Sequence, residues 1–457
     1  MKMAADSCNA KKLPGTIITI GGYGYSDVGD ESMPMAFIRN LQELLPSGPG
    51  IIMLSPFPDA TRQYHGMCSD HDIVFSSRAD DIKGLNTERD RYLRWTELFI
   101  KNRILAWLAM GLSSQYRFYK LLRQVSRCSA LVNVGGGNIN SIMRRELYKR
   151  CTMHAIAHRF SRPVFVSGQT IGPFCNDNDR FIAMDALRNA AVITFRDKDV
   201  SRETVASLGV TTPVMYDAGD DAFSLKKISR DKALDLIRRD AGKTWDALEC
   251  DYVWAINLKA SLRCFKGEGR SGSLSHEIDL TARIIEYILG VSQSKILLVS
   301  TDFSKTVDDR VILAEAADRV DPAALPRVAL LRGEYTPQEL KGIIATCDFA
   351  LGARYHFAVF ALSETVPAIC MASGEYQQRK LSGLMALLDV AEYYIATDME
   401  FAQLDDVRSC IDAILQDREK LQHKLRHNVP PLMRQSTKII RLLAGQLAPA
   451  TQQDGQT

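Results

Sequence analysis

The sequence lacks the patterns that mark several common classes of protein. Its 10 cysteines are scattered, with no C-x-x-C pair and no zinc-like spacing to histidine. We therefore expect reduced thiols, no disulfide framework and no resident metal. A formal net charge of +3 over 457 residues is close to balance, which argues against a nucleic-acid partner. Any basic site must therefore be local.

Long apolar runs are also missing. The first residues, MKMAADSCNAKKLPG, have no apolar core of the kind found in signal peptides, so we expect a cytoplasmic protein, with the inner face of the membrane as the alternative location. The most apolar stretch, residues 93–116, is interrupted by charges until Ile104. The uncharged remainder is shorter than the roughly 20 residues that span a bilayer. We expect a packed helix and no transmembrane segment, and we leave peripheral membrane contact open.

Short apolar runs alternate with helical patterns along the chain. This alternation is typical of parallel sheets with helices on both faces, so we predict an α/β fold of two doubly wound domains facing a cleft. The predicted strands lie in residues 16–22, 51–57, 130–137, 163–169, 191–197 and 214–220 of the first domain, and in 251–259, 294–302, 327–335, 348–354 and 366–373 of the second. The predicted units are an extension (1–15), a first domain (16–225), a linker and helix (226–250), a second domain (251–400), closing helices (401–447) and a disordered tail (448–457).

Polar and glycine-rich segments follow several strands of the first domain, where parallel sheets bind ligands. The candidate ligand-binding residues there are Gly22, Gly24, Asp30 and Glu31 after the first strand, Gly135, Gly136, Gly137 and Asn138 after the third, Gln169 after the fourth and Arg196 after the fifth. The first loop has neither the dinucleotide-binding nor the P-loop spacing. Tight turns, a helix cap by Asp30 and a local ion pair of Arg196 with Asp197 are the structural alternatives.

In the second domain, DFALGARYHFAVFAL places Arg354 at the end of a predicted strand and His356 in the first turn of the next helix. Lys380 follows further along the chain. A lone histidine is usually structural, but two domains presenting Arg196, Arg354 and Lys380 to one another would form a local cationic pocket. Such a pocket suits a small anion with several charges.

Taken together, these segments resemble the polysaccharide pyruvyl transferases. The resemblance runs from about residue 16 to 395 and rests on Gly29-Asp30-Glu31, VGGGNI, GQTIGP, TFRDKDVS, YDAGDDAF and GARYHFAVFAL, in that order. The chain departs from the family pattern at Asp221, where a proline is usual, and in YQQRK (residues 376–380), which replaces the usual Y-D-P-K.

The resemblance implies a GT-B-like fold of two Rossmann-like domains, with the first on the acceptor side. It implies an enzyme that transfers pyruvate from phosphoenolpyruvate to a sugar diol as a ketal, in polysaccharide or glycoconjugate biosynthesis, without a cofactor. It assigns catalysis to His356, Arg354 and Lys380, and donor binding to Arg196. The acceptor is then a sugar or glycan, with lipid-linked and nucleotide-linked forms both open. A GT-B glycosyltransferase using a nucleotide sugar and a non-catalytic glycan-binding assembly protein are the alternative functions.

Overall fold

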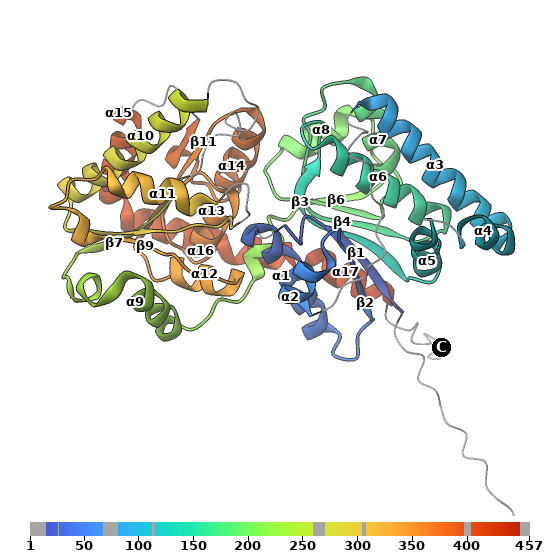
Figure 1. The fold of residues 1–457 in the computed structure, drawn as a ribbon, viewed down its shortest axis with the longest axis horizontal. Helices are drawn as coiled ribbons and strands as arrows, with labels where there is room; N and C mark the ends of the chain where they lie inside the picture. Colours follow the sequence, from blue (N-terminus) through green and yellow to red (C-terminus); the bar gives the residue numbers. More distant parts are fainter. Residues whose placement is uncertain are drawn as a thin grey trace, which may run out of the picture.

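The computed structural model describes residues 15–25, 27–66, 81–111, 115–258, 270–303, 308–396 and 404–447. Two six-stranded sheets, all of whose strands run parallel, form the cores of two α/β domains (Figure 1). Successive residues of the first strand, Ile17 and Ile18, are fully buried in different apolar clusters. Both faces of that sheet are therefore covered, as expected for near-continuous apolar strands. The predicted fold class is confirmed.

The first sheet and its helices are built from the first half of the chain. The strands are β1 Ile17–Gly21, β2 Ile51–Leu54, β3 Ala130–Ile139, β4 Val164–Ile171, β5 Val192–Phe195 and β6 Val214–Asp217. The helices are α1 Val28–Leu44, α2 Pro58–His65, α3 Ile82–Lys101, α4 Arg103–Met110, α5 Tyr116–Val125, α6 Arg144–Arg159, α7 Asp177–Leu187 and α8 Val200–Ser207, followed by the short 3-10 helix η1 Asp221–Ser224.

The second sheet follows the same alternation. Its strands are β7 Tyr252–Asn257, β8 Ser294–Leu298, β9 Val328–Leu330, β10 Phe349–Gly352, β11 Ala368–Ala372 and β12 Tyr394–Ala396. The helices are α9 Arg230–Ala247, α10 Arg270–Val291, α11 Asp309–Asp318, α12 Pro337–Ile344, α13 Tyr355–Ser363, α14 Glu375–Leu387, α15 Leu404–Gln416, α16 Arg418–Ser436 and α17 Lys438–Leu447, with η3 Leu325–Arg327 and η4 Ala391–Tyr393. Every predicted strand segment contains an observed strand, and β12 was not predicted.

In each sheet the sequential order of the strands changes direction at one point, although all the strands run parallel. The first sheet is ordered β2-β1-β3-β4-β5-β6 and the second β12-β11-β10-β7-β8-β9. The order reverses between β1 and β3 in one sheet and between β7 and β10 in the other. Ligands of open parallel sheets bind outside the carboxyl ends of the strands at these points. Most of the predicted site residues lie at the carboxyl end of β3, after β1 and β10, or at the start of the helices α1 and α13 that follow these two strands.

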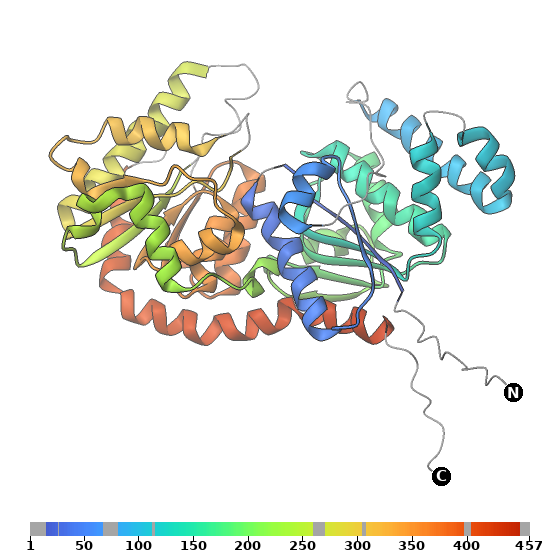
Figure 2. The same ribbon diagram turned by 60° about the horizontal axis from the view of Figure 1, so that its bottom comes forward.

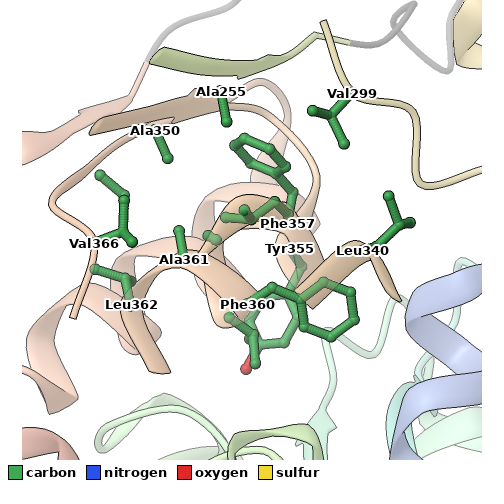
Figure 3. Close-up of a cluster of buried hydrophobic side chains, with 14 of the residues drawn as sticks. Ala255, Val299, Leu340, Ala350, Tyr355, Phe357, Phe360, Ala361, Leu362 and Val366 are labelled. Atoms are coloured by element: carbon green, nitrogen blue, oxygen red, sulfur yellow. The ribbon is translucent and has the colours of Figure 1, made fainter. Parts of the chain in front are cut away.

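Helix α13 is buried along its whole length. Its residues are apolar on all sides, which is typical of a helix enclosed by the core. Figure 3 shows Phe357 of this helix directed towards Ala255 and Ala350 of the central strands. Because α13 is held on every side, its N-terminal residues Arg354 and His356 are held with it.

The last helices connect the two domains. In Figure 2, α16 runs along the underside of both domains and leads into α17 beneath the first. Leu432 of α16 packs against Gly219 of the first domain, and Ile440 and Leu443 of α17 are buried in the core cluster that contains Phe37 of α1. The closing helices thus return to the first domain.

The apolar stretch at 93–116 forms two helices rather than one packed helix. Helix α3 ends at Lys101, and Asn102 caps α4 by accepting a hydrogen bond from the backbone of Leu105 at 3.0 Å. Helix α3 buries an apolar face, as expected, whereas α4 leaves Ile104 and Leu108 exposed. The packed-helix prediction is therefore wrong for α4. Among the described helices, none is long and apolar enough to cross a membrane.

Candidate functional site

The carboxyl ends of the two sheets are in direct contact. The backbone N–H of Val28, at the start of α1, donates to the carbonyl of Thr301 at 3.0 Å, and Asp27 forms an isolated β-bridge with Asp302. The Tyr355 hydroxyl donates to the carbonyl of Arg196 at 3.3 Å. Side chains from both switch points therefore meet at this domain interface.

The N-terminus of α1 contributes carboxylates to the interface. Asp27 caps the helix, accepting hydrogen bonds from the backbone N–H groups of Gly29 at 2.8 Å and Asp30 at 3.1 Å. A β-carbon on Gly22 would lie 2.7 Å from Oδ2 of Asp30, so the glycine leaves room for that carboxyl group. A β-carbon on Gly29 would lie 2.1 Å from Nδ1 of His356. Glycine at position 29 is thus what lets the histidine of the second domain approach the first.

One carboxylate, Asp220, joins Arg196 of the first domain to His356 of the second. Its Oδ2 accepts from Nη1 of Arg196 at 2.8 Å and lies 3.6 Å from Nε2 of His356. Burial by itself raises the pKa of Asp220, but the nearby charges of His356 and Arg196 and the hydrogen bonds at the carboxylate outweigh burial and lower it to about 2. Asp220 is therefore ionised, and it lies between the side chains of Arg196 and His356 and orients both.

Two tyrosine rings pack against the cationic groups of Arg196 and Lys380. The guanidinium of Arg196 lies over the ring of Tyr355, 4.2 Å from its centroid, and Nζ of Lys380 lies 5.7 Å from the same centroid. Nζ of Lys380 is also 4.4 Å from the centroid of Tyr376, whose hydroxyl donates to the carbonyl of Gly137 at 2.6 Å. Tyr376 and Lys380 are four residues apart on α14 and so share one face of the helix. The altered YQQRK motif thus still brings Lys380 to Arg196.

Arg354 is held by carboxylates of its own domain. Its Nε and Nη2 donate to Asp309 at 3.1 and 2.6 Å, and Nη2 lies 3.2 Å from Asp302. Although burial opposes its charge, the neighbouring carboxylates raise the pKa of Arg354 further above its usual range. Within the described part of the chain, Nη1 of Arg354 and Nη2 of Arg196 make no hydrogen bond. One terminal nitrogen of each arginine is thus without a hydrogen-bond partner among the described residues.

The site is a mixture of charges rather than the cationic pocket that we predicted. Five carboxyl groups, those of Asp27, Asp30, Asp220, Asp302 and Asp309, lie among the cations. Their effect is clearest at Asp30, where burial and the charge of Asp27 raise the pKa to about 7, against the opposing effect of His356, Arg196 and Lys380. Asp30 is therefore able to exchange a proton near neutral pH.

Four predicted site residues instead support the loops. Glu31 accepts a hydrogen bond from the backbone of Gly24 at 2.6 Å and pairs with His65 at 2.7 Å. The side chain of Gln169 donates to the carbonyl of Gly135. Glu31 and Gln169 thus hold the backbone of the loop after β1 and of the last part of β3. The structure brings together the other predicted residues, namely Gly22, Asp30, Gly136, Gly137, Asn138, Arg196, His356 and Lys380, with Arg354 beside them.

One cluster has the ligand types of a cation site. Ligand atoms of Asp27, Asp30 and His356 all lie within 4.8 Å of one another. One Asp27 oxygen already accepts two backbone hydrogen bonds, and the charges of Arg196 and Lys380 already act on Asp30. The cluster is thus partly neutralised by the protein itself.

Sequence reasoning missed the side chains that orient the predicted ones. Asp220 and Tyr355 lie in segments that were recognised, YDAGDDAF and GARYHF, but only the contacts show that they link the two domains. Asp302 ends a predicted strand, a signal that could have been used. Asp309 begins α11, and nothing in its sequence context indicates that it holds Arg354.

A comparison with known protein families shows which family this chain belongs to. The model of the polysaccharide pyruvyl transferase family matches residues 28–375. The chain belongs to this family. The match includes the first turn of α1, Arg196, Asp220, Arg354 and His356, whose contacts form the domain interface. The family resemblance drawn from the sequence motifs is confirmed.

Among curated proteins, this pyruvyl transferase family member has a distant relative. The amylovoran biosynthesis protein AmsJ of Erwinia amylovora is 21% identical over 248 residues. That match spans 54% of this chain and 57% of the relative.

Solved structures share the fold at low identity. MnaA of S. aureus in complex with UDP superimposes with a TM-score of 0.57 at 10% identity, covering 94% of this chain and 96% of that one. HepE of Anabaena in complex with UDP gives a TM-score of 0.53 at 13% identity, covering 95% and 99%. These similarities establish the GT-B-type arrangement of the two domains for this pyruvyl transferase family member.

Proposed function

We propose that this protein transfers the enolpyruvyl unit of phosphoenolpyruvate to a sugar diol, forming a pyruvate ketal and releasing phosphate. The observation that carries the proposal is the pair of arginines, one from each domain, each anchored by a carboxylate and each with a terminal nitrogen to offer. Phosphoenolpyruvate has two anionic groups, a carboxylate and a phosphate. Arginine donors in fixed positions suit both.

The proposed reaction balances without a redox partner. One sugar hydroxyl adds to the carbon that bears the phosphate ester, the methylene carbon gains a proton to become a methyl group, and the carbon–oxygen bond to phosphate breaks. The second hydroxyl then closes the ring. Of the two hydroxyl protons, one balances the new methyl group and the other leaves with phosphate.

His356 is our candidate for the acid that protonates the methylene carbon. It lies at the N-terminus of α13, and Asp220 is 3.6 Å from its Nε2, where a carboxylate would balance the charge of an imidazolium. A bound anionic donor would favour the protonated ring further. A protonated imidazole at this position would donate its proton to the methylene carbon, as general acid catalysis requires.

Asp30 is our candidate for the group that receives a proton from the attacking hydroxyl. Its pKa of about 7 makes it a stronger base than an ordinary carboxylate, and its ligand atom lies within 4.8 Å of that of His356. Arg196 and Arg354 would bind the donor and stabilise the developing charge, with Lys380 assisting. The backbone at Gly137 and the side chain of Asn138 would line the acceptor side.

The proposal is tested by thermal unfolding with added phosphoenolpyruvate and, separately, with a panel of nucleotide sugars. A ligand that binds only the folded state raises the unfolding midpoint. We expect phosphoenolpyruvate to raise the midpoint of the wild type and to have no effect on Arg354→Ala. The control is Arg441→Ala, an exposed arginine of α17, which should respond as the wild type does. Stabilisation by a nucleotide sugar alone would refute the proposal and favour a glycosyltransferase.

A further inference from the structure

We infer that helix α4 and the basic residues around it form a docking surface for an anionic lipid bilayer. We call this the α4 surface: the apolar residues Ile104, Leu105, Trp107 and Leu108, with the basic residues Lys101, Arg103, Arg117, Lys120, Arg123 and Arg127. It lies in α3 to α5 and the turn that follows, outside the site described above. The inference does not depend on the chemistry proposed for that site.

Helix α4 exposes four large apolar side chains close together in the sequence. Ile104 is 74% exposed, Leu105 51%, Trp107 44% and Leu108 52%, whereas Ala106 and Met110 are buried against the first domain. Single exposed apolar residues are ordinary on protein surfaces, but a contiguous group of large ones marks an interaction site. Figure 1 shows α4 at the outer end of the first domain, away from the second, and Figure 2 agrees.

The chain segment that contains α4 carries charges of one sign only. Between residues 98 and 127 the sequence contains six basic residues and no aspartate or glutamate, although the whole protein is nearly neutral. Five of the six side chains are exposed and Lys120 is half-buried. Across the described residues, none of the six forms an ion pair. The nearest acidic residue before them in the sequence, Glu97, lies 3.7 Å from Arg159 instead.

This combination fits a bilayer better than it fits a second copy of the chain. A symmetric dimer through α4 would bring two groups of like charges together, which opposes association. An anionic bilayer offers phosphate groups to the cations and hydrocarbon to the apolar residues at the same time. Tryptophan favours this boundary because its ring is apolar with one polar edge. The short α4 would lie in the plane of the interface rather than cross it.

The test is flotation of the full chain with vesicles of phosphatidylcholine alone and of phosphatidylcholine mixed equally with phosphatidylglycerol. We expect binding to the mixed vesicles that weakens as salt rises, and little binding to phosphatidylcholine alone. Ile104→Gln with Leu108→Gln, and separately Lys101→Gln with Arg103→Gln, should each weaken binding about tenfold or more.

Matched control variants distinguish binding through the α4 surface from non-specific binding to vesicles. Phe181→Gln with Val311→Gln removes equally exposed apolar residues elsewhere, and Lys232→Gln with Lys243→Gln removes exposed lysines of α9. Both controls should bind as the wild type does, and all variants should keep its unfolding midpoint. The emission of Trp107, taken as the difference from Trp107→Phe, should shift to the blue on binding.

Two results would overturn the inference. One is equal binding of the α4 variants and the wild type to the mixed vesicles, or no binding by either. The other is a dimer of the wild type in sedimentation velocity that becomes a monomer in Ile104→Gln with Leu108→Gln, which would make α4 a contact between copies. Neither result would affect the donor test above, which uses the free protein and a soluble ligand.

Discussion

The cations at the domain interface and those around α4 differ in their surroundings. Arg196 is almost completely buried and Arg354 is mostly buried, and each donates hydrogen bonds to a carboxylate. The cations around α4 are mostly exposed and have no acidic neighbour within the segment from 98 to 127. The first group is held in one geometry by buried partners, whereas the second is free to meet a charged surface.

The comparison indicates what each arrangement can do. A buried ion pair contributes little net stability, because desolvation offsets the attraction, but it fixes the positions of its members. Exposed cations fix no geometry and act at a distance that salt reduces. Positioned charges suit chemistry on a small anion, and unpaired charges suit adhesion to a large one. The predictions below alter three residues of the domain interface, and the vesicle experiment described above tests the exposed cations around α4.

The largest effect should come from His356→Ala. If the imidazole supplies the proton, turnover of phosphoenolpyruvate should fall by about 10²–10⁴-fold, while the unfolding midpoint still rises with added donor. Rates of ketal formation and donor titrations by thermal unfolding measure the two properties. His423→Ala, at an exposed position on α16, serves as the control. Full turnover by His356→Ala would exclude the histidine as the acid.

Asp220→Asn should destabilise the fold. The change leaves Arg196 and His356 without their shared carboxylate, and breaking a buried ion pair costs about 3–5 kcal/mol. Because the pKa of Asp220 is lowered to about 2, its contribution to stability is present above its unfolded pKa and is lost as the pH falls towards 2. Urea unfolding at pH 7 measures the difference.

The comparison variant is Asp231→Asn, which changes an exposed carboxylate in the first turn of α9. It should change the free energy of unfolding by no more than about 0.5 kcal/mol. Equal stability of the two variants would show that Asp220 does not hold the interface together.

Asp30→Asn should have a smaller effect on stability, and its pH dependence should be opposite in sign to that of Asp220. The folded protein holds a proton on Asp30 up to about pH 7, whereas the unfolded chain releases it near the ordinary aspartate pKa of 3.8. Wild-type stability should therefore fall between these two pH values, through Asp30, as the pH rises. The asparagine variant lacks this dependence, so its stability relative to the wild type should rise by on the order of 1 kcal/mol from pH 5 to pH 8.

Urea unfolding of both proteins at the two pH values measures this difference. A constant difference in stability would mean that Asp30 does not hold its proton to neutral pH. It would also remove the argument for Asp30 as a base, while leaving the role of His356 untouched.

Local sequence was enough to predict the strands and the residues at their ends. Each of the short apolar runs predicted as strands formed one, because a β-branched run buried on both faces is typical of a parallel sheet. The three-residue β12 was missed because so short a segment carries no periodicity. The break between α3 and α4 was also missed. It occurs at Asn102, whose capping hydrogen bond competes with continuation of the helix.

By itself, the sequence determined the fold class, the family motifs and the chemical types of the main site residues. These depend on local patterns and on the order of segments along the chain. Only the tertiary structure showed that Asp220 lies between Arg196 and His356, that Glu31 faces Gly24 rather than the site, and that α4 leaves its apolar side chains uncovered. These features depend on which segments meet after folding. A carboxylate's partners and the cover over a helix come from residues distant in the chain, so no local pattern can specify them.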